Sequence, residues 1–147
     1  MGKKVIMGAG NLLLKDEGIG VHVVHEMLKR DWPDDIEIVD AGTSALDLLP
    51  YIFGVEKLII VDALQGGNEP GSIYRLTPED ITMPKNYSVS LHQTNLLETL
   101  DMASRIGQRP PTVIIGIEPK EIAYDVSLSP EVQSKIPSII QHVEAEL

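Results

Sequence analysis

A glycine-containing segment that ends in two adjacent carboxylates follows the first apolar run of the chain. It reads Gly8-Ala9-Gly10-Asn11 and continues to Asp16-Glu17-Gly18. The dinucleotide-binding pattern G-x-G-x-x-G would need a glycine where this sequence has Leu13. Because the segment instead brings two carboxylates to the mouth of a predicted sheet, it favours metal or acid–base chemistry over phosphate binding.

More acidic residues follow the later predicted strands, namely Asp40, Asp62 and Glu118. Ligands of open α/β sheets bind outside the carboxyl ends of the parallel strands, so we expect these residues to converge with Glu17 at one edge. Their mutual repulsion must be balanced by a cation, by protonation or by hydrogen-bond donors, and a metal is the simplest balance. Neighbouring loop residues would line a substrate groove: Gly10, Asn11, Gly42 and Thr43.

His92 is the histidine expected to join these carboxylates. It lies in Ser90-Leu91-His92-Gln93, whose spacing is that of a capping box, so it falls in a first helical turn. The positive end of the helix disfavours imidazolium there and leaves a neutral ring that can ligate a metal. Glu17, Asp62 and His92 would meet only through folding. Two carboxylates and one imidazole suit zinc, nickel, iron or manganese without choosing among them.

Each of these three residues also has an ordinary structural interpretation. Asp62 could cap the turn before Ala63, because Asp is a common turn residue. Glu17 could complement the dipole of the following helix, and His92 could be an exposed first-turn residue. His22 and His25 lie on the polar face of that helix, so solvent exposure is favoured over metal binding.

Alternation of strands and helices predicts a single doubly wound α/β domain over residues 1–147, with helices on both faces of a mostly parallel sheet and one added edge strand. Short β-branched runs predict buried parallel strands at Lys4–Gly8, Ile36–Ala41, Leu58–Asp62 and Val113–Ile117, and alternation predicts the edge strand at Gly71–Thr77. Helices are expected at Ile19–Arg30, Ser44–Tyr51, Thr77–Asp80, from Ser90 onward, and from Ser129 to Leu147 with a kink at Pro137.

Composition excludes several classes of function. Twelve basic and 22 acidic residues give a formal charge of −10, which disfavours nucleic acid and anionic membranes as partners. The absence of cysteine excludes disulfides, thiolate catalysis and cysteine-ligated metals. No apolar run approaches the 18 residues of a membrane span, so the cytoplasm is the expected location.

Two other enzyme classes lack their sequence motifs. Ser44 follows Gly42-Thr43, but the nucleophile elbow G-x-S-x-G needs a second glycine where Leu46 stands. The phosphate-binding pattern G-x-x-x-x-G-K-[ST] is absent as well. Serine hydrolase and Walker-type nucleotide chemistry are therefore both disfavoured.

Six segments taken together resemble the hydrogenase maturation proteases. They read G-A-G-N-L-L-L-K-D-E-G-I-G, V-D-A-G-T, L-I-I-V-D-A, S-L-H-Q, I-G-I-E-P and L-S-P-E-V, in family order from Val5 to the C-terminal helix. The resemblance implies an endopeptidase that removes a C-terminal extension from the large-subunit precursor of a nickel-iron hydrogenase after nickel insertion. It also implies that Glu17, Asp62 and His92 form a nickel-binding set.

The resemblance leaves the role of the metal open. In the favoured version the three residues contact nickel that the precursor itself brings, although zinc or cadmium could occupy the same site. The hydrolytic water would then be activated by a carboxylate such as Asp40. In the other version the metal polarises the scissile carbonyl or activates water. The competing classes are a nickel-reading chaperone without proteolytic activity and a nucleotide-dependent enzyme on the same sheet.

Overall fold

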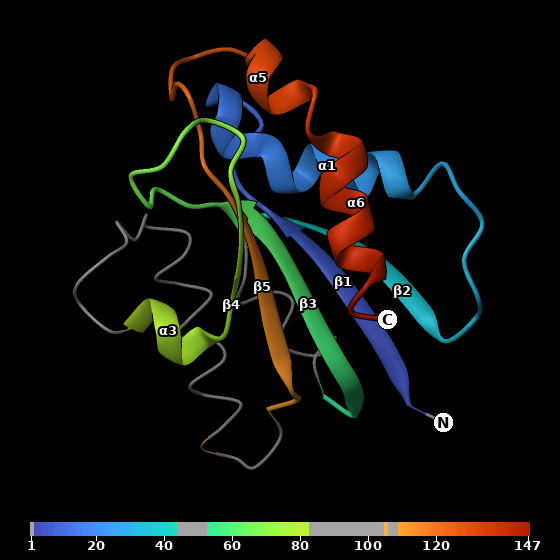
Figure 1. Cartoon of the computed structure of the whole chain (residues 1–147). Coiled ribbons are helices and arrows are strands. Elements are labelled where there is room, and N and C mark those ends of the chain that lie inside the picture. The colour runs from blue at the N-terminus through green and yellow to red at the C-terminus, as the bar shows by residue number, and fades with distance from the viewer. Residues whose placement is uncertain (1, 44–52, 83–104, 106–108) are drawn as a thin grey trace.

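The computed structural model describes residues 2–43, 53–82, 105 and 109–147 (Figure 1). Its sheet has five strands in the order β2-β1-β3-β5-β4. Four of them are parallel, and β4 pairs antiparallel with β5 at one edge, which confirms the predicted added edge strand. The strands are β1 (Lys3–Ala9), β2 (Ile36–Gly42), β3 (Val55–Ala63), β4 (Ile73–Leu76) and β5 (Thr112–Ile117).

Alternation along the central strands sorts their side chains into two apolar clusters, one on each face of the sheet. On β1, Ile6 belongs to one cluster while Val5 and Met7 belong to the other. On β3, Ile59 and Val61 alternate in the same way with Leu58 and Ile60. Burial on both faces explains why these strands read in the sequence as nearly continuous apolar runs.

Helices α1 (Ile19–Met27), α5 (Pro130–Gln133) and α6 (Ile136–Glu144) cover the face that carries Ile6 and Ile59 (Figure 1). Helix α1 ends at Met27, three residues before the predicted Arg30, and Leu28 is 55% exposed instead of facing inward. The reason lies beyond the helix, because the indole N–H of Trp32 donates to the Met27 carbonyl at 2.7 Å. Trp32 packs against this core cluster in place of Leu28.

The C-terminal segment forms two helices, so the prediction of one kinked helix was wrong. Helix α5 ends at Gln133, and α6 begins at Ile136 with Pro137 in its first turn. Proline lacks the N–H that an interior helical residue must donate, whereas first-turn N–H groups have no partner inside the helix anyway. Pro137 is therefore accommodated in the first turn of a new helix, which begins at Ile136.

The predicted capped turn after β4 is confirmed as helix α3 (Pro78–Thr82). Thr77 donates its backbone N–H and its hydroxyl to Asp80 Oδ2, at 2.9 and 3.0 Å, and Pro78 occupies the first helical position. The helices predicted at Ser44–Tyr51 and from Ser90 lie outside the described residues. No described helix is both long and apolar enough to span a membrane.

Glu146 binds the C-terminus to two strands of the sheet through Arg75 and Lys57. We expect these ion pairs to make the free energy of unfolding depend on pH. The Glu146 carboxylate accepts hydrogen bonds from Arg75 at 2.6 Å and from Lys57 at 3.0 Å. The Arg75 bond, with Lys57 acting against desolvation, lowers the pKa of Glu146 from 4.5 to about 2. This stabilisation is present above the unfolded pKa and is lost as pH falls through the folded value.

Replacing Glu146 by Gln should lower the free energy of unfolding by about 1 kcal/mol near neutral pH, since solvent screens these partly exposed pairs. The difference from wild type should shrink between pH 4.5 and about 2. Urea unfolding followed by circular dichroism measures both quantities. The matched control is Glu144→Gln. It removes a nearby carboxylate whose only ion pair among the described residues is a looser one, 3.7 Å from Arg30, so it should lower stability less. Equal losses in the two variants, or a difference that persists at low pH, would contradict the assignment.

Candidate functional site

Gly10 connects the loops that follow β1 and β2. Its φ is +133°, and its backbone N–H donates to the Gly42 carbonyl at 2.9 Å. A Cβ at this position would lie 2.0 Å from the Glu17 carbonyl oxygen, so the Glu17 backbone packs directly on Gly10. The structure thus brings Gly10, Gly42 and Glu17 together at the carboxyl edge of the sheet.

We expect Gly10→Ala to destabilise the protein by about 3 kcal/mol, because it adds a close contact to an unfavourable φ. Gly67 is the matched control, since it has φ +82° and nothing within 4 Å of an added Cβ. Gly67→Ala should cost only about 1 kcal/mol, from the backbone conformation alone. Thermal unfolding of both variants makes the comparison. Similar losses would show that the close approach to Glu17 contributes nothing.

The other predicted groove residues shape the same two loops. Asn11 Oδ1 accepts the Leu13 N–H at 2.9 Å, and the Asn11 carbonyl accepts the Leu14 N–H at 3.1 Å, so Asn11 closes a turn. Gly42 has φ +51°, and Thr43 is exposed beside it.

Two of the three predicted metal ligands lie at this edge. Glu17 is half-buried in the short 3-10 helix η1 (Lys15–Gly18), which contacts β3. Asp62 is the penultimate residue of β3, is only 2% exposed, and accepts the Ala63 N–H at 2.8 Å. A Cβ on Gly20 would lie 2.0 Å from the Val61 carbonyl, so the start of α1 packs on β3 just before Asp62.

The third predicted ligand, His92, lies outside the described residues. Within the described part of the chain, no group of three or more His, Asp or Glu residues could hold a metal ion. The three-ligand set therefore stays a prediction, with the backbone segments of Glu17 and Asp62 placed along the same edge. Asp62 also makes the bond to Ala63 that its ordinary turn-capping interpretation required.

Asp40, the candidate for activating water, is exposed at the end of β2. Its Oδ1 accepts the Gly42 N–H at 3.0 Å, and its Oδ2 lies 2.7 Å from His25 Nε2. His25 is exposed as predicted and pairs with Asp40, whereas the predicted exposure of His22 was wrong, because its ring is half-buried with a buried Nε2. The register places Gly8 between Asp40 and Val61, so β1 separates Asp40 from the strand that carries Asp62.

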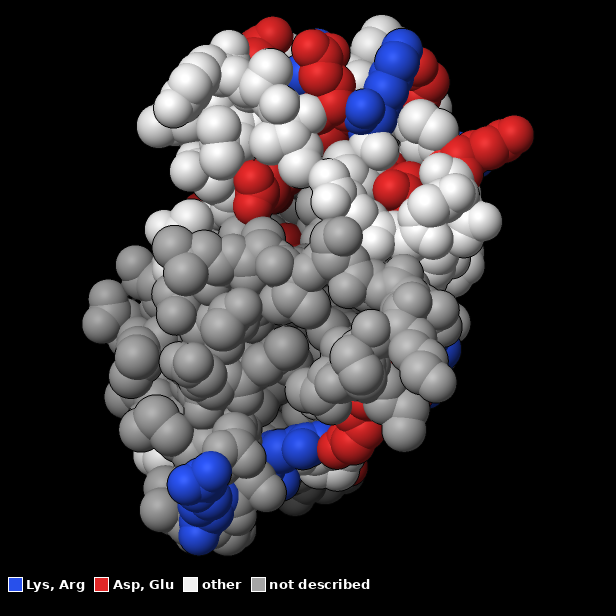
Figure 2. Space-filling view, turned by 90° about the vertical axis from the view of Figure 1, so that its left-hand side faces the viewer, with Lys and Arg blue, Asp and Glu red and all other residues white. Residues whose placement is uncertain are grey.

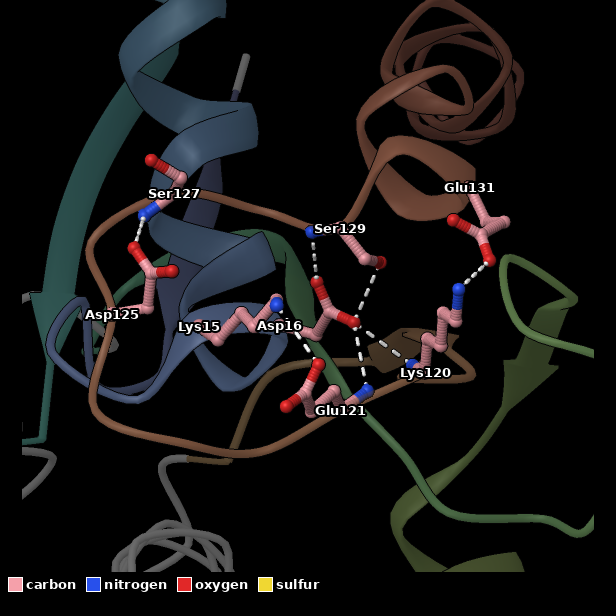
Figure 3. A network of polar contacts seen from close by, with 8 residues as sticks. All are labelled: Lys15, Asp16, Lys120, Glu121, Asp125, Ser127, Ser129 and Glu131. Carbon is pink, nitrogen blue, oxygen red and sulfur yellow. Dashed lines mark hydrogen bonds and ion pairs between the residues drawn. The ribbon is translucent and has the colours of Figure 1, made fainter.

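Asp16 is fully buried, and hydrogen-bond donors balance its charge. Ser129 donates its N–H to Oδ1 and its hydroxyl to Oδ2, both at 2.8 Å, and the Lys120 and Glu121 N–H groups donate to Oδ2 at 2.9 and 3.0 Å (Figure 3). Burial by itself raises the pKa of Asp16, but these bonds outweigh it and hold the pKa below its ordinary value.

Glu118 is balanced in the same way at the end of β5. Its Oε1 accepts N–H groups from Gly66 at 2.8 Å and Asn68 at 3.2 Å, and the Tyr74 hydroxyl at 2.5 Å. Burial, with help from this carboxylate, raises the pKa of Tyr74. Hydrogen-bond donors, one of the three ways of balancing these charges that the sequence left open, therefore satisfy Asp16 and Glu118.

Acidic side chains gather at the upper end of the molecule in Figure 2, which is the carboxyl edge of the parallel strands. The sequence placed these acids at one edge, but it gave no sign of what pairs with Asp16. Ser129 lies 113 residues further along the chain. Only the folded chain shows that this carboxylate accepts hydrogen bonds from backbone N–H groups.

Comparison with known proteins identifies the family. A family model described as "Hydrogenase maturation protease" matches residues 21–146. The hydrogenase 2 maturation protease of Escherichia coli K12 is 32% identical over 97% of this chain and 89% of its own length. The hydrogenase expression/formation protein HupD of Bradyrhizobium diazoefficiens is 35% identical over 92% of this chain and 73% of its own.

Solved structures agree with the sequence comparison. The hydrogenase maturating endopeptidase HybD from Escherichia coli superposes with a TM-score of 0.90 at 32% identity, covering 99% of this chain and 91% of that one. A [NiFe] hydrogenase maturation protease from Thermococcus kodakarensis has the same fold, with a TM-score of 0.83 at 23% identity and 97% of each chain covered. The fold, the carboxylates at its edge and these similarities lead to one conclusion: the chain belongs to the hydrogenase maturation protease family, whose members are endopeptidases.

Proposed function

We propose that this chain removes a C-terminal extension from the large-subunit precursor of a nickel-iron hydrogenase, in the cytoplasm, after nickel has been inserted. Family membership supports the reaction class, and the observation that carries the site is the burial of Asp62 at the end of β3. The turn that carries Glu17 packs against Gly10 at the same edge. Two carboxylates at the mouth of a parallel sheet lie where ligands of such sheets bind.

Nickel enters this proposal as part of the substrate. The donor set of Glu17, Asp62 and His92 would supply two carboxylates and one imidazole, which suits a divalent transition metal such as nickel. Three side chains leave coordination positions that the precursor's own ligands can keep. Contact with the ion would thus report that the precursor is loaded before the peptide bond is cut. Zinc or cadmium would bind the same donors.

Asp40 is our candidate for accepting a proton from the hydrolytic water. Because its oxygens already hold the Gly42 N–H and His25, this role requires the contact with His25 to open. We expect Asp40→Asn to lower kcat by about 100-fold, the usual size of a general-base contribution, while His25→Ala changes it little. Initial rates of precursor cleavage decide. Full activity in Asp40→Asn would assign Asp40 to shaping the Gly42 turn alone.

A nucleotide-dependent reaction has no support in this loop. Leu13, at the position of the third glycine, is 61% exposed, and the Glu17 backbone occupies the space above Gly10. The acids of η1 stand between β1 and α1, where negative charge would oppose a phosphate at the helix N-terminus.

The test of the proposed function is a multiple-turnover assay. Purified protein is mixed with a large excess of nickel-loaded precursor, and intact mass is followed with time. Loss of one C-terminal peptide from many precursor molecules per protease molecule is the expected result. Binding without any loss of mass would instead identify a chaperone that reads nickel.

A further inference from the structure

The 119–128 loop, which connects β5 to α5, runs beside the segment that carries Glu17. The Lys15 N–H donates to the Asp125 carbonyl at 2.8 Å, and the Asp125 N–H donates to the Leu13 carbonyl at 3.0 Å. The Lys15 ammonium also pairs with the Glu121 carboxylate at 2.8 Å. Residues more than a hundred positions apart are thus connected by hydrogen bonds and an ion pair around the start of η1.

Asp16 is the buried residue at the centre of this network of polar contacts (Figure 3). Both of its carboxylate oxygens accept hydrogen bonds from Ser129, just before α5, and Oδ2 also accepts the N–H groups of Lys120 and Glu121. The Asp16 N–H donates in turn to the Glu121 carbonyl at 3.3 Å. A single side chain therefore fixes the beginning and the end of the 119–128 loop against η1.

The backbone next to Asp16 is held in an unfavourable conformation. Lys15 has φ +52°, in the left-handed region, which costs a non-glycine residue about 1 kcal/mol or more. Such strain persists only where surrounding contacts enforce it. The bonds to Asp16 and to the Lys15 N–H are those contacts, and the next residue in the chain is Glu17.

We infer that Asp16 is a positioning residue: its carboxylate locks the turn at Lys15 and thereby holds Glu17 at the carboxyl edge of the sheet. The functional part of this inference rests on the role proposed for Glu17. The two adjacent acids then have different roles. Asp16 binds only the protein's own N–H and hydroxyl groups, and Glu17 binds the nickel of the precursor.

Asp16→Asn is the sharpest probe, because it keeps the size of the side chain. Oδ1 accepts one backbone N–H and Oδ2 accepts two, so the amide NH2 of Asn faces at least one of them in either orientation. Ser129→Ala is milder, since it removes only the hydroxyl donor. Glu146→Gln is the matched control, because it removes a hydrogen-bonded carboxylate at the C-terminus, beyond α6, where Glu146 bonds Arg75 and Lys57.

Two readouts are measured on each variant under conditions where circular dichroism shows it folded. Amide exchange by NMR reports the Glu17 N–H, which bonds the Leu14 carbonyl at 3.1 Å. Precursor cleavage gives kcat and KM separately. Asp16→Asn should speed exchange of the Glu17 N–H at least tenfold and lower kcat about 100-fold with little change in KM. Glu146→Gln should leave the exchange rate, kcat and KM unchanged.

Unchanged exchange at Glu17 in Asp16→Asn would overturn the inference, and so would faster exchange with wild-type kcat. If Asp16→Asn does not fold, Ser129→Ala decides, with about threefold faster exchange confined to residues 14–18 as the expected result and unchanged exchange as the contrary one. A wild-type protein that leaves the precursor intact would refute the proposed function. The exchange rates would still decide whether Asp16 locks this turn.

Discussion

Replacing Glu17 by Gln, Asp62 by Asn or His92 by Ala is expected to abolish processing of the precursor while the fold remains. Even the loss of a residue that only supports a metal ligand costs ten- to a hundredfold at metal sites, so the loss of a ligand should cost more than about 100-fold. Asp62→Asn keeps an oxygen that can accept the Ala63 N–H, so the β3 end should survive the change. Initial rates by mass spectrometry, with circular dichroism of each variant, test this expectation.

Glu69→Gln is the matched control, because it removes one exposed carboxylate from the loop that follows β3. It should process the precursor at the wild-type rate. Wild-type rates in all three site variants would overturn the site. Equal losses in the control would show that overall negative charge, and not a specific set of ligands, supports the reaction.

A nickel-free precursor is expected to be processed at least about 100-fold more slowly than the loaded one. If contact with the ion contributes about 3 kcal/mol to the productive complex, its absence reduces the rate by two orders of magnitude. Zinc-loaded precursor is the informative control, since zinc accepts the same donors. Cleavage with zinc would mean that the site reads the presence of an ion rather than its identity.

The central fold followed from the sequence because its signals are local. The runs around Ile6, Ile59 and Ile115 are buried on both faces of the sheet, so β-branched residues follow one another without polar interruption. The Thr77 cap and its proline also act within one turn of chain. By contrast, the end of α1 depends on the Trp32 indole reaching the Met27 carbonyl, which no helical pattern contains.

The candidate site divides in the same way. The sequence indicated that Glu17 and Asp62 follow parallel strands, and topology then places both segments along one edge. It did not indicate which acids accept hydrogen bonds from the backbone. Asp16 and Glu118 look like their neighbours in the sequence, but N–H groups 50 to 113 residues away satisfy them. Such partners depend on tertiary structure and leave no periodic signal.

The most direct test of nickel-gated processing is one time course of intact mass on two precursor samples that differ only in nickel. Wild-type protein is added to each at a small fraction of the precursor concentration. We predict that the loaded sample loses a single C-terminal peptide over many turnovers while the nickel-free sample keeps its full mass. Trimming of both samples at the same rate would contradict nickel-gated processing, and an unchanged mass in both would contradict the proteolytic function itself.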